Sequence, residues 1–171
     1  MNVAQIRQAF EDVFDQALLF HGFAAHMRDY DLYLYAAADP RTGLRPDHLR
    51  YRFVNCVRAS VASSVARDVW ARSLDDTFTD NVEWLAAGSP EGYVWGVRWQ
   101  MLYPGLALLP PTPETREWAA QLGVPFYEAV VETNAHTISL VFSDLRVDKL
   151  AAGATPFVVE DDEPDAKVPP E

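Results

Sequence analysis

Three polar side chains around one expected hairpin turn have types that could do acid–base chemistry. Glu132, Asn134 and His136 alternate in the stretch VVETNAHTISLVF, and a histidine beside a carboxylate can act as a general base. Strand alternation places Glu132 and His136 across the turn from each other, where such pairs commonly stabilise a hairpin. We therefore expect a structural role for this trio, and catalysis at His136 is the alternative.

Four carboxylates form an acidic loop in the stretch SLDDTFTDNVEW, at Asp75, Asp76, Asp80 and Glu83. Paired carboxylates can share a proton or hold a divalent cation. Their spacing lacks the alternation and the glycine of a calcium loop, so it favours solvated surface or helix capping. The same charges are candidates for contact with a cationic partner.

An aromatic face is expected on the segment GYVWGVRWQM, where Tyr93, Trp95, Val97 and Trp99 share one side of a strand. Each large ring can bury roughly 150–250 Å². Aromatic stripes usually pack inside a protein, so we expect this face to be a wall of the core. The alternative is a cleft near Trp95, Trp99 and His136 that binds a small molecule.

Thiol and metal chemistry have weaker signals. Cys56 is the one cysteine, and strand parity places it on the same face as Arg52 and Arg58, whose charge could lower the thiol pKa. With no histidine near it in the sequence, a packed, inert cysteine is the better interpretation. The four histidines show no zinc-ligand spacing, so we expect no metal and no cofactor. The candidate binding residues are Asp75, Asp76, Asp80, Glu83, Trp95, Trp99, Asn134 and His136.

The elements that must position these residues begin with a helix. Asn2 can cap it and Gln5 completes a capping box. Apolar residues continue at helical spacing as far as Leu18, so we expect the helix to end near Gly22. The apolar stripe consists of Val3, Ile6, Phe10, Val13, Phe14, Ala17 and Leu18.

Alternation with a period of two predicts a mainly antiparallel sheet. The expected strands cover 30–36, 49–61, 93–103, 127–131 and 136–142, and further helices are expected over 65–74 and 112–122. The alternation slips between Phe142 and Leu145, which indicates a β-bulge at Ser143-Asp144. The predicted fold is α+β, with four or five strands in the sheet and two or three helices packed on one face.

Length and charge predict one domain over residues 1–159 and an acidic, disordered tail over 160–171. Of the net charge of −11, the tail contributes −5 and the rest −6. Such a charge disfavours nucleic acid and anionic lipid, and it is compatible with a basic protein partner. A single cysteine and an N-terminus unlike a signal peptide predict a cytoplasmic location. The oligomeric state stays open.

Three stretches resemble bacterial proteins grouped as YxiG-like: FHGFAAHMRDYDLYLYAAADPRTG, SLDDTFTDNVEWLAAGSPEGYVWGVRWQMLYPG and VVETNAHTISLVFSDLRV. The resemblance covers most of residues 1–150 and implies no activity and no catalytic residues. The pattern also resembles small immunity proteins, which bind and neutralise toxins. The main prediction is a non-catalytic protein-binding or inhibitory module. The alternatives are a small-molecule binder or hydrolase-type enzyme using the cleft, and a structural subunit that dimerises through an edge strand.

Overall fold

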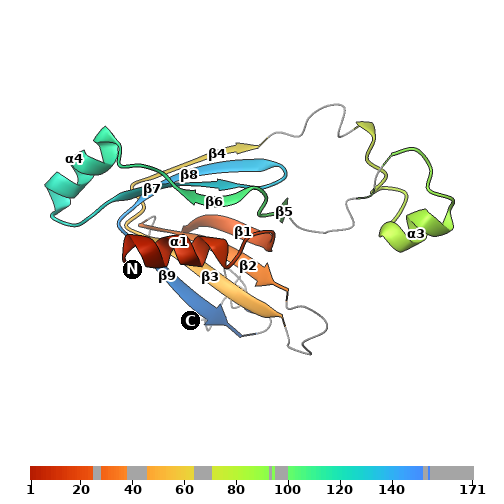
Figure 1. Cartoon of the computed structure of the whole chain (residues 1–171), viewed down its shortest axis with the longest axis horizontal. Coiled ribbons are helices and arrows are strands. Elements are labelled where there is room, and N and C mark those ends of the chain that lie inside the picture. The colour runs from red at the N-terminus through yellow and green to blue at the C-terminus, as the bar shows by residue number, and fades with distance from the viewer. Residues whose placement is uncertain are drawn as a thin grey trace, which may run out of the picture.

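Two antiparallel sheets form the body of the protein (Figure 1). The computed structural model describes residues 1–24, 28–37, 46–63, 71–92, 94, 100–151 and 154. The five-stranded sheet has the order β5-β1-β2-β3-β9, with β1 (Ala17–Ala24), β2 (Asp29–Ala36), β3 (Asp47–Val54), β5 (Gln100–Met101) and β9 (Asp144–Leu150). The four-stranded sheet has the order β4-β8-β7-β6, with β4 (Arg58–Ser63), β6 (Gly105–Leu108), β7 (Tyr127–Glu132) and β8 (His136–Phe142).

Three helices accompany the sheets in the described part of the chain, α1 (Val3–Glu11), α3 (Asn81–Ala86) and α4 (Pro113–Leu122). The expected α+β class with antiparallel pairing is confirmed, and each sheet has four or five strands; the division into two sheets was not expected. Helix α1 packs into the core, α4 lies at one end of the four-stranded sheet, and α3 stands apart from both sheets (Figure 1).

The core lies between the sheets and is closed by α1. Phe53 is fully buried, and its ring centroid lies 6.3 Å from that of Phe10 and 4.8 Å from that of Phe142. One residue from the helix, one from β3 and one from β8 thus meet at this point. The Tyr51 hydroxyl donates to the Ala9 carbonyl at 2.8 Å, which ties α1 to β3. Burial of these rings supplies much of the driving force that holds the layers together.

The N-terminal helix is shorter than its apolar spacing predicts. Its capping box is confirmed, since Asn2 and Gln5 each bond to the other's backbone N–H. However, α1 ends at Glu11, and residues 17–24 form strand β1 instead. That strand pairs along its length with β2, and these backbone hydrogen bonds outweigh the local helical pattern.

The prediction of a single strand over 49–61 is wrong, because the segment forms parts of two strands, β3 and β4. The chain leaves β3 after Val54, takes a left-handed conformation at Asn55 (φ 47°), and enters β4 in the other sheet at Arg58. A strand that bends into a second sheet changes which face is buried: Tyr51 and Phe53 are buried, but Val61 is 44% exposed.

The partner strands make the same transfer. The chain leaves β8 after Phe142 and enters β9 at Asp144. The expected bulge at Ser143-Asp144 is therefore a sheet-to-sheet corner. Val54 pairs with Asp144, and Arg58 pairs with Val141. Three residues (55–57) lie between these pairs on one strand and two (142–143) on the other. The extra residue therefore belongs to the segment that faces Ser143. Bends of this kind are how strands switch sheets at a corner.

Asp31 is a polar residue buried on the face of the five-stranded sheet that is opposite to the core. Asp31 is 1% exposed, and both of its carboxylate oxygens accept hydrogen bonds of 2.8 Å from the Arg52 guanidinium. Arg50 makes a second, more exposed ion pair with Asp148 at 2.7 Å. The alternating arginines of β3 are thus paired with carboxylates of neighbouring strands.

Several predicted features lie outside the described residues. These are Trp95 and Trp99 with most of the aromatic strand, residues 65–70 of the expected second helix, and the tail over 160–171. The helix expected over 112–122 is confirmed as α4, with Thr112 as its cap and Gly123 left-handed at its end. Within the described part of the chain, no helix has both the length and the apolar character required to cross a bilayer.

Candidate functional site

Two histidines lie together at a cavity of about 250 Å³ between β1 and the β7–β8 turn. The ring centroids of His21 and His136 are 5.6 Å apart, and the rings meet edge to face. We call this cavity the histidine pocket. Its described lining consists of Leu18, Leu19, Phe20, His21, Gln100 and His136.

Each histidine is held through its Nδ1 atom. His21 Nδ1 lies 2.7 Å from the Tyr30 hydroxyl, and His136 Nδ1 lies 2.6 Å from the Ser63 hydroxyl. The tautomers decide which atom donates. No hydrogen bond within the described residues involves either Nε2 atom, so Nε2 is the nitrogen that remains for a ligand.

Burial tunes the protonation of this pocket. It lowers the pKa of His21, and the neighbouring charge of His136 lowers it further. Burial, with a smaller contribution from Cys56, raises the pKa of Tyr30 to about 12. At neutral pH His21 is therefore a neutral imidazole beside a protonated phenol. A neutral imidazole can accept a hydrogen bond or a proton from a bound molecule.

Asn134 has a geometric role at the hairpin turn. Its side-chain oxygen accepts a hydrogen bond from the Met101 backbone N–H at 3.1 Å. Its backbone N–H donates to the Met101 carbonyl at 3.3 Å. Asn134 thus joins the turn of the four-stranded sheet to β5 of the other sheet. It does not belong to the described lining of the histidine pocket.

The expected pairing of Glu132 with His136 is wrong. Glu132 lies opposite Thr137 in the ladder between β7 and β8, and His136 bonds instead to Ser63, which is opposite it on β4. Sequence reasoning missed both Ser63 and His21. Neither has a local signal, because each reaches His136 through pairing between strands that are distant in the sequence.

The acidic loop is largely used to build α3. Asp80 caps the helix, since its carboxylate accepts from the N–H groups of Val82 and Glu83 at 2.8 and 2.9 Å. Glu83 in turn accepts from the Thr79 N–H at 2.8 Å. The helix-capping interpretation is confirmed for these two residues. Asp75 accepts from the Ser73 hydroxyl. The residues that the structure describes contain no cluster of three or more His, Cys, Asp or Glu side chains that could hold a metal ion.

Residues 71–92, here called the acidic segment, fold largely on themselves. The Trp84 indole donates to the Pro90 carbonyl at 3.0 Å. Gly92 has a φ of 129°, and a Cβ there would lie 2.7 Å from the Arg72 carbonyl, so only glycine lets the two ends of the segment meet. The segment carries five carboxylates and one arginine, a net charge of −4. The segment includes α3 and stands away from the sheets (Figure 1).

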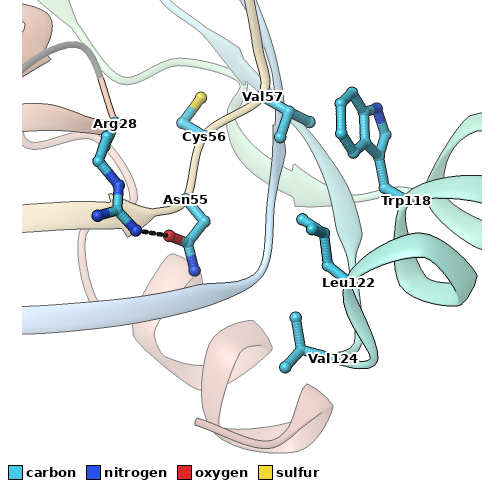
Figure 2. Close-up of a pocket in the computed structure, with 7 residues that line it drawn as sticks. All are labelled: Arg28, Asn55, Cys56, Val57, Trp118, Leu122 and Val124. Atoms are coloured by element: carbon cyan, nitrogen blue, oxygen red, sulfur yellow. Dashed lines mark hydrogen bonds between the residues drawn. The ribbon is translucent and has the colours of Figure 1, made fainter.

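A second cavity, of about 570 Å³, opens at the corner where the strands change sheets. Figure 2 shows its lining, with Arg28 and Asn55 opposite the side chains of α4 and the loop that follows it. We call it the corner cavity. It is lined by Arg28, Asn55, Cys56, Val57, Trp118, Leu122 and Val124.

Cys56 in the corner cavity is not an activated thiol. Burial raises its pKa to about 11, although a backbone hydrogen bond to Arg58 opposes this shift. The two arginines expected to activate it are engaged elsewhere, Arg52 with Asp31 and Arg58 with Glu114 and Glu128. Cys56 is packed, as expected, and its raised pKa favours the inert interpretation.

The comparisons with known proteins give a family. None of the curated proteins compared with the chain matches it. The family model described as YxiG-like protein matches residues 2–160, which include α1, both sheets, the acidic segment and the linings of both cavities. The chain therefore belongs to the YxiG-like protein family.

Proposed function

We propose that this protein is a non-catalytic binding module that attaches to a basic protein through its acidic segment, in the manner of an immunity protein. The observation that carries the proposal is the surface of α3. Val82 is 72% exposed and Leu85 is 61% exposed, and residues three apart lie on one face of a helix. Protein interfaces combine such an apolar centre with a polar rim.

The charges around this apolar pair define the partner. Asp75, Asp76 and Glu91 are exposed carboxylates of the same segment. Together with Asp80, Glu83 and Arg72 they give the segment a net charge of −4, in a chain whose net charge is −11. Complementary charge speeds encounter with a cationic surface and disfavours anionic partners. Binding inhibits the partner if the cationic surface that the acidic segment covers is also the surface that binds the partner's anionic substrate.

The apolar pair is expected to act as the anchor. Changing Val82 and Leu85 together to serine should weaken capture of the basic partner at least about tenfold, because burying one aliphatic side chain contributes ~1.5–3 kcal/mol. The measurement is affinity capture from a native lysate of the source cells, followed by binding isotherms with the purified captured protein. Neither side chain supports the core, so folding is preserved.

A matched control and a charge variant complete the experiment. Val61→Ser removes an equally small side chain, 44% exposed on β4, and should leave affinity unchanged. Asp75→Asn with Asp76→Asn should slow association and reduce its salt dependence; Asp80 and Glu83 are left intact because they cap α3. Equal affinities for the Val82/Leu85 double variant and the Val61 variant would refute the proposal.

A second candidate function, a small-molecule site or hydrolase-type centre, is favoured by the histidine pocket. Two imidazoles share one cavity, and both have their Nδ1 atoms engaged. In the tautomer whose Nδ1–H donates to Tyr30, Nε2 of neutral His21 is an acceptor, and a ligand that donates a hydrogen bond to it should bind best above the lowered pKa of that histidine. Its affinity should fall as the pH drops through that pKa, because the protonated ring no longer accepts.

The electrostatic coupling between His21 and His136 provides a test of this second candidate function. His21 should titrate below its usual value of about 6.5, and His136→Gln should raise the pKa of His21 by removing the like charge. His48→Gln, which changes a histidine that meets Tyr35 edge to face, is the control. NMR titration of the imidazole protons, with and without a mixture of small alcohols and amides, measures both effects. If no added compound perturbs either ring, the pocket is not a ligand site.

A further inference from the structure

We propose that the corner cavity binds a small amphipathic anion, a carboxylate with a hydrocarbon body. The cavity has one cationic side and one apolar side (Figure 2). Its volume of about 570 Å³ lies within the range of ~300–1,000 Å³ typical of small-molecule sites. It involves neither the acidic segment nor the histidine pocket, so it is independent of the functions proposed above.

The cationic side is Arg28. Within the described part of the chain, no carboxylate lies at ion-pair distance from its guanidinium, whereas Arg52 and Arg58 each pair with an acid. Arg28 instead donates one hydrogen bond, of 3.2 Å, to the side-chain oxygen of Asn55. A guanidinium has five donors in a fixed fork, so this bond orients the group and leaves donors for an anion.

Asn55 is a rigid support for that guanidinium. Its side-chain nitrogen donates to the Ser143 hydroxyl at 2.9 Å, and its backbone N–H donates to the Asp29 carboxylate at 3.1 Å. The corner between the sheets thus fixes the residue that holds Arg28. A group held in place before binding loses less freedom when the ligand arrives.

The apolar side comes from α4 and the loop after it. Leu122 is 50% exposed and Val124 is 41% exposed, and Trp118 stands beside them in the cavity wall (Figure 2). These side chains face the cavity and not the core, which leaves apolar surface that a hydrocarbon chain would cover. A carboxylate at Arg28 with its chain laid along Leu122 and Val124 satisfies both sides at once.

Binding here is reversible and involves no covalent step. Cys56 is buried, and its thiol stays protonated at neutral pH. The expected ligand is therefore held by one charge-assisted hydrogen-bond group and by apolar contact alone.

The test compares octanoate with octanol, its neutral counterpart, by isothermal titration calorimetry on the full chain. Octanoate should bind more tightly. Arg28→Gln should weaken octanoate binding up to about fivefold, because an ion pair near the surface contributes ~0.2–1 kcal/mol, and it should leave octanol binding unchanged. Arg116→Gln, which removes the same charge from an exposed position of α4, is the control and should have no effect.

Methyl NMR of the same titration locates the ligand. The methyl signals of Leu122 and Val124 should shift on adding octanoate, and those of Val82 on the distant α3 should not. Leu122→Ser with Val124→Ser should abolish binding of both compounds without unfolding the protein, because both positions are largely exposed. Equal affinity for octanoate and octanol, an Arg28 variant that behaves like the Arg116 variant, or shifts confined to other methyl groups would each overturn the proposal.

Discussion

Replacing Arg52 by methionine is expected to lower the free energy of unfolding by about 3–5 kcal/mol, because the change leaves a buried carboxylate without its counter-charge. Asp31 is 1% exposed, and both of its carboxylate oxygens accept from Arg52. The hydrogen bond to Asp31 also raises the pKa of Arg52, although burial acts against it. Methionine keeps the apolar stem and removes only the charged group.

The same substitution at Arg50 is the matched control. Arg50 lies two residues away on β3 and also pairs with an acid, but the Asp148 side chain is 44% exposed. Exposed pairs contribute little, so Arg50→Met should cost no more than about 1 kcal/mol. Urea unfolding followed by circular dichroism measures both. Changing Asp31 to Asn in the Arg52 variant should recover part of the loss, because the amide carries no charge. Similar midpoints for the two single variants would contradict this account of β3.

Changing Asn55 to alanine is expected to cost about 3–4 kcal/mol, because it combines backbone strain with the loss of two hydrogen bonds. Asn55 has a φ of 47°, a conformation that costs alanine about 1–2 kcal/mol. Its side chain also bonds to Arg28 and Ser143, and a typical hydrogen bond contributes about 1 kcal/mol net.

Asn55→Gly separates these two contributions. Glycine loses the same hydrogen bonds but accepts the left-handed conformation, so it should be about 1 kcal/mol less destabilising than alanine. Denaturant midpoints of the two variants give the comparison. If alanine proves no worse than glycine, strain at the corner is not what makes asparagine favourable there, and the hydrogen bonds alone account for its effect.

Short-range patterns in the sequence were sufficient to predict several elements. The capping box of Asn2 and Gln5, the helix over 112–122, and the hairpin of β7 and β8 were all correct, and so was the antiparallel α+β class. Each depends on residues within a few positions of one another. Cap hydrogen bonds and side-chain alternation act over that distance, so the sequence displays them directly.

Longer-range features needed the tertiary structure. The pairing with β2 made Ala17–Ala24 a strand despite its helical spacing, and the passage between sheets at Asn55 and Ser143 was visible in the sequence only as a slip in alternation. His21 and His136 meet because β1 and β8 belong to different sheets that face each other. Local spacing sets what each segment can form, but hydrogen bonding and burial between distant strands decide which form is adopted and which side chains meet.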